Sequence, residues 1–178
     1  MLKIGPPGGH IDQMMRETRN HHYQLSALAD RKAAMLLSVS AIVVPLTLRY
    51  LDDPILRYPA MTMILFCVLT IAQVAYASMP RIFRAKPPDP SSRLFNPMFF
   101  GDFAHLDYDE YLTHWETILS DPAHTYEAQV REVYVLGKYL AGHKYKYLRR
   151  GYLMFIAGSL ISCLVWVVMM IIAWYQQW

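Results

Sequence analysis

The chain has 178 residues, of which 54% are hydrophobic, 13% aromatic and only 17% charged. Soluble domains carry about a quarter charged residues, and a chain of this length buries only about 70% of its unfolded surface in water. The composition therefore argues against a soluble single-domain enzyme and favours a small membrane protein. The two cysteines, Cys67 and Cys163, lie in apolar runs and indicate neither a disulfide framework nor a metal-ligand cluster. The N-terminal residues lack an apolar signal-peptide core, so we expect no cleaved export signal.

Three stretches contain no Asp, Glu, Lys or Arg, and two of them exceed 20 residues, the length that a helix needs to cross a bilayer core of about 30 Å. The first stretch has 16 uncharged residues between Lys32 and Arg49. Both flanking side chains can reach the interface while their stems stay in apolar surroundings. We therefore predict an all-α membrane protein with transmembrane helices at 33–50, 60–80 and 152–175.

The positive charges predict the orientation of these helices. Five of the 17 Lys and Arg residues lie in 1–32, two in 49–59 and ten in 81–151. Because loops rich in Lys and Arg stay in the cytoplasm, the N-terminus and the long loop are predicted to be cytoplasmic and the C-terminus external. The expected organisation is a cytoplasmic helix continuous with the first span at 1–32, an external loop at 51–59, and a cytoplasmic linker with a helical hairpin at 81–151.

A helical repeat precedes the first span. Its members alternate at spacings of three and four residues and therefore share one stripe of a helix: Ile11, Met14, Thr18, His21, Leu25, Leu28, Lys32 and Met35. No Gly or Pro separates this stripe from the span, so we expect one helix from about His10 into the membrane. Pro45 disturbs that helix only near its outer end, where a proline costs less than at mid-helix.

The segment at 80–97 is rich in proline and polar residues, which predicts irregular structure. It leads into MFFGDF, an expected aromatic turn with Gly101 at its bend. Asp107 and Glu110 then form a capping-box pattern at the start of a helix. The apolar face of this helix is predicted to consist of Tyr108, Tyr111, Leu112, Trp115 and Leu119.

The pair Asp121-Pro122 ends that helix and begins the next one, because proline suits the first helical position. The following helix is expected to continue into the third span. Its predicted stripe is Tyr126, Val130, Val133, Gly137, Leu140, Lys144 and Leu148. Two of the three spans are therefore predicted to be prolonged into a cytoplasmic helical bundle.

Small residues four positions apart occur in two spans, as Ala34 with Ser38 and as Gly158 with Ser162. Such pairs let helix backbones approach closely in lipid, and both packing within one chain and self-association explain them. Gln73 is the one strongly polar side chain of the second span. A helix–helix hydrogen bond and a pore-lining position are both compatible with it.

Chemistry-bearing motifs are missing from the sequence. It contains no phosphate-binding loop, dinucleotide fingerprint, zinc-protease motif or nucleophile elbow. His21 and His22 are adjacent and point to different helix faces, a poor spacing for a metal site. We therefore predict no catalytic residues and no metal site, and we regard a membrane-bound enzyme as the weakest hypothesis.

Basic and aromatic side chains alternate before the third span. The cluster comprises Lys138, Lys144, Lys146, Arg149 and Arg150, interleaved with Tyr139, Tyr145, Tyr147 and Tyr152. Its membrane-proximal part is typical of anionic headgroup binding. Arg131 and Lys138 with Tyr134, farther from the span, suit a phosphate and a stacked base.

Three pieces of the sequence, at 29–44 (ADRKAAMLLSVSAIVV), 96–103 (NPMFFGDF) and 131–155 (REVYVLGKYLAGHKYKYLRRGYLMF), carry a family likeness. With this span order, the chain resembles the Pycsar-type transmembrane effector family of bacterial anti-phage defence. The resemblance implies a protein encoded beside a separate nucleotide cyclase, whose product, cyclic CMP or cyclic UMP, activates the effector. The effector then impairs the inner membrane and halts growth of the infected cell.

Matched to this sequence, the resemblance points to eight candidate ligand contacts: Asp30, Lys32, Asn96, Phe100, Arg131, Tyr134, Lys138 and Lys144. Three spans cannot enclose an aqueous pore, so the leading hypothesis is a non-enzymatic homo-oligomer in the bilayer, gated by a cyclic nucleotide and without a nucleic-acid partner. The alternative is a constitutive membrane scaffold that docks a soluble partner through the helices of residues 99–148.

Overall fold

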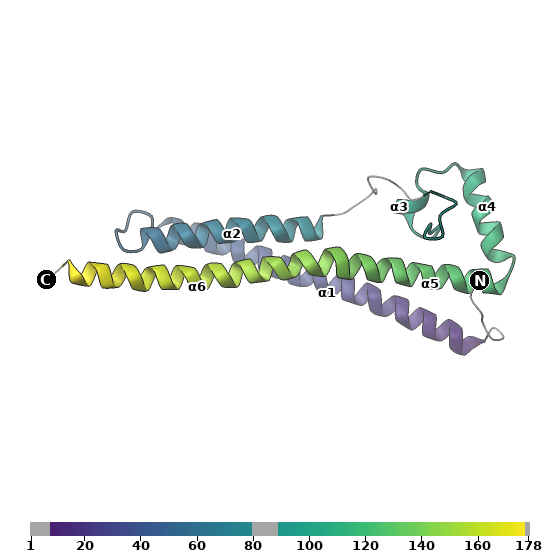
Figure 1. Cartoon of the computed structure of the whole chain (residues 1–178), viewed down its shortest axis with the longest axis horizontal. Helices are drawn as coiled ribbons and strands as arrows, with labels where there is room; N and C mark the ends of the chain where they lie inside the picture. Colours follow the sequence, from purple (N-terminus) through teal and green to yellow (C-terminus); the bar gives the residue numbers. More distant parts are fainter. Residues whose placement is uncertain (1–7, 80–88, 177–178) are drawn as a thin grey trace. The chain divides into compact units, whose positions relative to one another are not determined.

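The computed structural model describes residues 8–79 and 89–176, and within these ranges it contains helices and turns but no strand. The helices are α1 (Gly9–Leu48), α2 (Arg57–Ser78), α3 (Phe100–Phe103), α4 (Tyr108–Leu119), α5 (Pro122–Tyr139), a π-helix η1 (Leu140–Lys144) and α6 (Tyr145–Tyr175) (Figure 1). Three runs of helix are long and apolar enough to cross a membrane: α1, α2 and the stretch from α5 through α6. The all-helical prediction with three such helices is confirmed.

The predicted helix boundaries follow from local chemistry. α1 begins at Gly9, next to the predicted His10, and continues past Pro45. The Asp107 carboxylate accepts a hydrogen bond of 2.8 Å from the backbone N–H of Glu110 and so caps α4. Asp121 caps α5 by accepting a bond of 2.9 Å from Ala123 N–H, with proline in the first turn. Only half of the predicted capping box forms, because the Glu110 side chain makes no return bond within the described residues.

Residues 80–88 of the predicted irregular segment lie outside the described residues, and 89–99 form turns. The predicted bend at Gly101 is wrong, because this residue lies inside the one-turn helix α3. A Cβ atom at this position would overlap the ring of Phe99. The glycine is therefore needed for close contact with an aromatic ring.

The chain divides into two compact units. Unit 1 consists of Met1–Ser26 and Pro80–Leu140, and unit 2 of Ala27–Met79 and Ala141–Trp178. Unit 2 contains α2, α6 and the second part of α1. Unit 1 contains the first part of α1 together with α3, α4 and α5.

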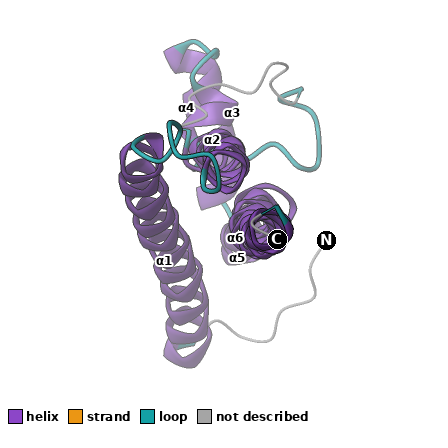
Figure 2. Ribbon diagram, turned by 90° about the vertical axis from the view of Figure 1, so that its left-hand side faces the viewer, coloured by secondary structure: helices purple, strands orange, loops and turns teal. Residues whose placement is uncertain are grey.

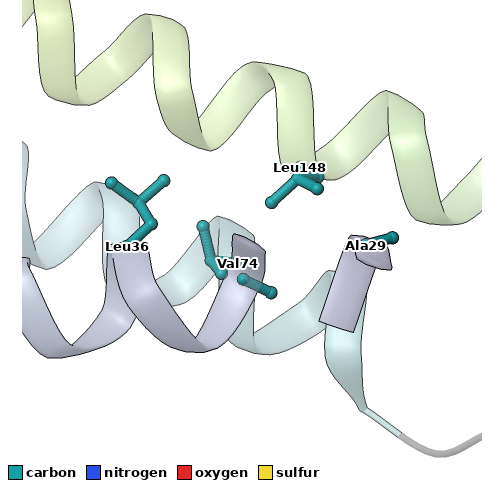
Figure 3. Close-up of a cluster of buried hydrophobic side chains, with 5 residues drawn as sticks. Ala29, Leu36, Val74 and Leu148 are labelled. Carbon is teal, nitrogen blue, oxygen red and sulfur yellow. The ribbon is translucent and has the colours of Figure 1, made fainter. Parts of the chain in front are cut away.

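The core of unit 2 lies where α1, α2 and α6 meet. Its buried side chains are Ala29, Ala33, Leu36, Val74 and Leu148 (Figure 3). α2 and α6 lie side by side (Figures 1 and 2).

Small residues of α6 make the contact with α2 close. A Cβ atom at Gly151 would overlap Val74, and one at Gly158 would overlap Phe66. The Ser162 hydroxyl donates a hydrogen bond of 2.8 Å to the Pro59 carbonyl. Gly158 and Ser162 thus serve packing within the chain.

The buried face of α1 differs from the predicted stripe. Of the predicted residues, Met14, His21, Leu28, Lys32 and Met35 are exposed. Met15 is buried in unit 1, and Ala29, Ala33, Leu36 and Ser40 are buried in unit 2. The prediction followed the large apolar side chains, whereas close helix packing selects alanine and serine. Ala34 and Ser38, the other small pair, are exposed.

The predicted apolar face of α4 is only partly covered. Ile118 is buried, Tyr111 and Trp115 are half-buried, and Tyr108, Leu112 and Leu119 are exposed. The helical spacing groups these side chains but does not tell which edge of the apolar stripe meets the rest of the fold.

Candidate functional site

The two units divide the eight candidate ligand contacts between them. Unit 1 contains Asn96, Phe100, Arg131, Tyr134 and Lys138, and unit 2 contains Asp30, Lys32 and Lys144. The two groups are therefore described separately.

Arg131 of α5 is engaged inside unit 1. Its guanidinium donates a hydrogen bond of 2.7 Å from Nη1 to the Phe95 carbonyl, and Nη2 lies 3.8 Å from the Glu127 carboxylate. Phe95 is buried, and its ring centroid lies 4.8 Å from that of His114 in α4. Arg131 thus fixes the turn before α3 to α5.

Asn96 belongs to the same turn and is buried. Its side-chain oxygen accepts a hydrogen bond of 3.1 Å from Met98 N–H. Its own N–H donates to the Asp102 carboxylate at 3.2 Å. These bonds give Asn96 the role of a turn residue, while the neighbouring Phe100 is exposed.

Tyr134 and Lys138 form an exposed stripe on α5 together with Val130. The three residues follow one another at four-residue spacing, which places them on one helix face, and all three are exposed, Tyr134 by 54%. A phenol ring four residues from an ammonium group offers stacking and charge to an anionic ligand that carries a ring.

In unit 2 the structure brings two candidates together. Lys144 Nζ lies 2.7 Å from the Asp30 carboxylate, and the Lys144 side chain is only 12% exposed, against 51% for Asp30. Lys32 is exposed, and its carbonyl accepts a bond of 3.4 Å from the Tyr152 hydroxyl. The charge of Lys144 is therefore matched within unit 2.

The sequence reasoning missed a polar network on the first part of α1. Glu132 of α5 accepts hydrogen bonds from Arg19 at 3.5 Å and from the Tyr23 hydroxyl at 3.3 Å. The Tyr126 hydroxyl donates a bond of 2.6 Å to Asp12. No short motif marks these pairs, since their members lie more than 100 residues apart.

Two tyrosines of this network have shifted titrations. Burial, and next the negative charge of Glu132, raise the pKa of Tyr23. The hydrogen bond to Asp12 raises the pKa of Tyr126. Both shifts favour the protonated phenol, which is the form that donates the hydrogen bond.

A second missed feature is η1 with the ring cluster around it. π-Helical turns are rare and are frequent at functional sites. His143 is buried, with ring centroids 5.3 Å from Tyr76 and 5.0 Å from Tyr147. The Arg150 guanidinium lies 5.3 Å from the Tyr147 ring centroid, a cation–π distance. The available signal was the His-x-x-x-Tyr spacing at 143 and 147.

Among residues 8–79 and 89–176, no group of three or more His, Cys, Asp or Glu side chains could hold a metal ion. Five of the eight candidate residues are exposed to solvent. Two are cationic (Lys32 and Lys138), two are aromatic (Phe100 and Tyr134), and one is acidic (Asp30, with its side chain 51% exposed).

No curated protein and no solved structure matches the chain significantly. Residues 13–173 match PycTM, the Pycsar effector protein domain. This match covers both units and all eight candidate residues, and it confirms the resemblance seen in the sequence: the chain belongs to the Pycsar effector family.

Proposed function

We propose that this chain is a membrane effector of bacterial anti-phage defence, activated by a cyclic nucleotide to disrupt the inner membrane and stop growth of the infected cell. The observation that carries the proposal is the family match over residues 13–173 in a chain with three helices long and apolar enough to span a bilayer. Family membership implies an anti-phage effector that responds to a cyclic nucleotide. The three apolar helices favour the membrane as its target.

The proposed topology has the N-terminus and residues 81–151 in the cytoplasm and the C-terminus outside. The distribution of Lys and Arg supports it, with two of 17 in the loop at 49–59 and none after the third span. The spans lie at 33–50, 60–80 and 152–175. α1 and the run from α5 to α6 are helical across both sides of the proposed boundaries, which supports prolonged spans.

The proposed ligand is a cyclic mononucleotide of the cyclic CMP or cyclic UMP type, made by a separate cyclase. Within the candidate set we place its contacts at Tyr134 and Lys138. Both are exposed on one face of α5, whereas Arg131, Asn96 and Lys144 are already engaged within their units. An ammonium group suits the phosphate and a phenol suits the base.

The proposed active form is a homo-oligomer, because three spans cannot enclose an aqueous pore. The nucleotide shifts the resting and active arrangements only by the difference between its affinities for them. The protein acts by this shift and catalyses no reaction.

The test is dye uptake by bacteria that make the full chain, with and without a co-expressed cytidylate or uridylate cyclase. Dye uptake and growth arrest are expected only with the cyclase. Lys138→Gln should abolish the response, while Lys146→Gln, an exposed lysine later in the sequence, should keep it. Unchanged permeability across both cyclases would contradict the proposed activation.

A further inference from the structure

α4 carries an apolar face that unit 1 leaves uncovered. Tyr108 is 71% exposed, Leu119 68% and Leu112 38%. The three lie on one stripe of the helix because their spacings of four and seven residues return to the same side. α4 lies outside the predicted spans, so lipid tails do not cover this face. An apolar stripe of this kind marks an interaction surface.

The surroundings of the stripe are acidic. Asp109 and Glu116 lie three and four residues from Leu112, and both are exposed. The charged side chains of α4 are Asp109, Glu110 and Glu116, and the helix contains no Lys or Arg. An anionic membrane surface and a nucleotide phosphate would both be repelled here. The surface calls for an apolar partner with positive charge.

The stripe on α5 has that character. The apolar Val130 and the aromatic Tyr134 are both exposed. The positively charged Lys138 follows them on the same face of α5. The two stripes consist of different residues of the same unit. The α4 stripe of one copy of the chain can therefore bind the α5 stripe of a second copy.

We propose that the acidic face of α4, formed by Tyr108, Asp109, Leu112, Glu116 and Leu119, docks on the α5 stripe of a second copy of this chain. In this contact the apolar side chains meet Val130 and Tyr134, and the carboxylates meet Lys138. Confinement of both copies to one bilayer raises their effective concentration, which lets a contact of this small size hold.

The contact also regulates the proposed ligand site. This consequence rests on the proposed function, since Tyr134 and Lys138 are the residues assigned there to the cyclic nucleotide. A carboxylate of α4 occupies the place of the phosphate. Cyclic nucleotide and the neighbouring α4 therefore compete for α5. Ligand releases this resting contact, while the spans keep the copies together in the proposed oligomer.

The test uses full-length protein in lipid vesicles, over a series of protein-to-lipid ratios. It measures energy transfer between a donor on α4 of one copy and an acceptor on α5 of another, which gives the dissociation constant of this contact. Glu116→Lys and Lys138→Glu should each raise the dissociation constant at least about tenfold, because like charges then face each other. The double variant should return to within about threefold of the unchanged protein, because the charges are exchanged and paired again. Glu110→Lys is the matched control. It is exposed on the same helix but away from the stripe, and it should behave as the unchanged protein.

Equal energy transfer for Glu116→Lys, Glu110→Lys and the unchanged protein would overturn the contact, as would the absence of energy transfer at every protein-to-lipid ratio. Failure of the double variant to recover would overturn the pairing of these two charges. Binding of α4 to vesicles of anionic lipid, or to a soluble partner in place of a second copy, would likewise overturn it.

Adding cyclic CMP and cyclic UMP to the unchanged protein separates this inference from the proposed function. A raised dissociation constant with either nucleotide supports the competition. Charge exchange that works while neither nucleotide has an effect would leave the contact standing and contradict both the competition and the assignment of the nucleotide to α5.

Discussion

The two units are held together by different physics. In unit 2, two glycines of α6 allow close contact with side chains of α2. Gly158 lies against Phe66, and Gly151 lies against Val74. In unit 1, side-chain hydrogen bonds join segments that are distant in the sequence. Arg131 donates to the Phe95 carbonyl, and Tyr126 donates to Asp12. Close packing of helices is therefore more prominent in unit 2, and hydrogen bonds between distant segments are more prominent in unit 1.

The difference fits the solvents that the sequence predicts for the two parts. Lipid tails give no hydrophobic drive for helix association, so close packing has to supply it. In water, polar pairs are exchangeable, and ions, pH and ligands compete with them. We infer that unit 1 is the part of the molecule suited to respond to a signal.

The largest effect is expected from Gly158→Ala. The added Cβ would overlap the Cβ of Phe66, an atom next to the backbone, so α2 and α6 would have to separate. Overpacking of this kind costs about 2 kcal/mol. The measurement is thermal unfolding of the purified protein in detergent, with a lowered midpoint expected.

Gly142→Ala is the matched control for this prediction. A Cβ at position 142 meets nothing within 4 Å. Gly142→Ala should therefore leave the midpoint unchanged or raise it, because alanine favours a helix more than glycine does, by up to about 1 kcal/mol of unfolding free energy. Equal losses at both glycines would show that helix contact does not hold unit 2.

Arg131→Ala should come next. It removes a charged donor from the Phe95 carbonyl and is expected to cost about 1.5 kcal/mol. Limited proteolysis between 89 and 99 should then become faster. Lys138→Ala, at an exposed side chain of the same helix, should change proteolysis little and abolish the nucleotide response. The reverse pattern would make Arg131 the ligand contact and refute its structural role.

A smaller effect is expected from Asp30→Asn in unit 2. The change removes the charge 2.7 Å from Lys144 while keeping the side chain's shape. Because Asp30 is half-exposed and water screens the pair, the loss should be about 1 kcal/mol. Asp30→Asn with Lys144→Met should recover part of the unfolding midpoint, and no recovery would argue against a coupled pair.

The smallest effect concerns pH and unit 1. The bond to Asp12 raises the pKa of Tyr126 in the folded protein. The stabilisation is therefore fully present below the pKa of an unfolded tyrosine, about 10, and is lost as pH rises through the higher folded value. Unfolding midpoints of the unchanged protein and Tyr126→Phe should differ at pH 8 and converge above pH 10. A difference that grows with pH would contradict this sign.

Local features of the fold could be predicted from the sequence because their causes are local. Asp107 and Asp121 cap helices within three residues of themselves. The apolar runs of α2 and α6 are long enough to predict candidate membrane spans by counting residues. The buried face of α1 could not be predicted, because contact at Ala29 and Ala33 depends on how closely other helices approach.

The candidate site was less accessible to sequence reasoning. The sequence suggests that Arg131 is free to bind a phosphate. In the structure it donates to a backbone carbonyl 36 residues away, and no pattern of side chains in the sequence reveals such a partner. Tyr134 and Lys138 remain predictions. The π-helix at Leu140–Lys144 has ordinary helix-forming residues around Gly142, so the sequence does not distinguish its wider turn from an α-helix. Only the ring cluster beside it has a signal, the spacing of His143 and Tyr147.

The most direct test of the central claim uses purified full-length protein in liposomes that contain a self-quenched dye. Addition of cyclic CMP or cyclic UMP should release the dye from these liposomes and not from empty ones, and Lys138→Gln should remove this dependence on the nucleotide. Dye retained at saturating concentrations of both nucleotides, or released equally without them, would contradict a nucleotide-gated membrane effector.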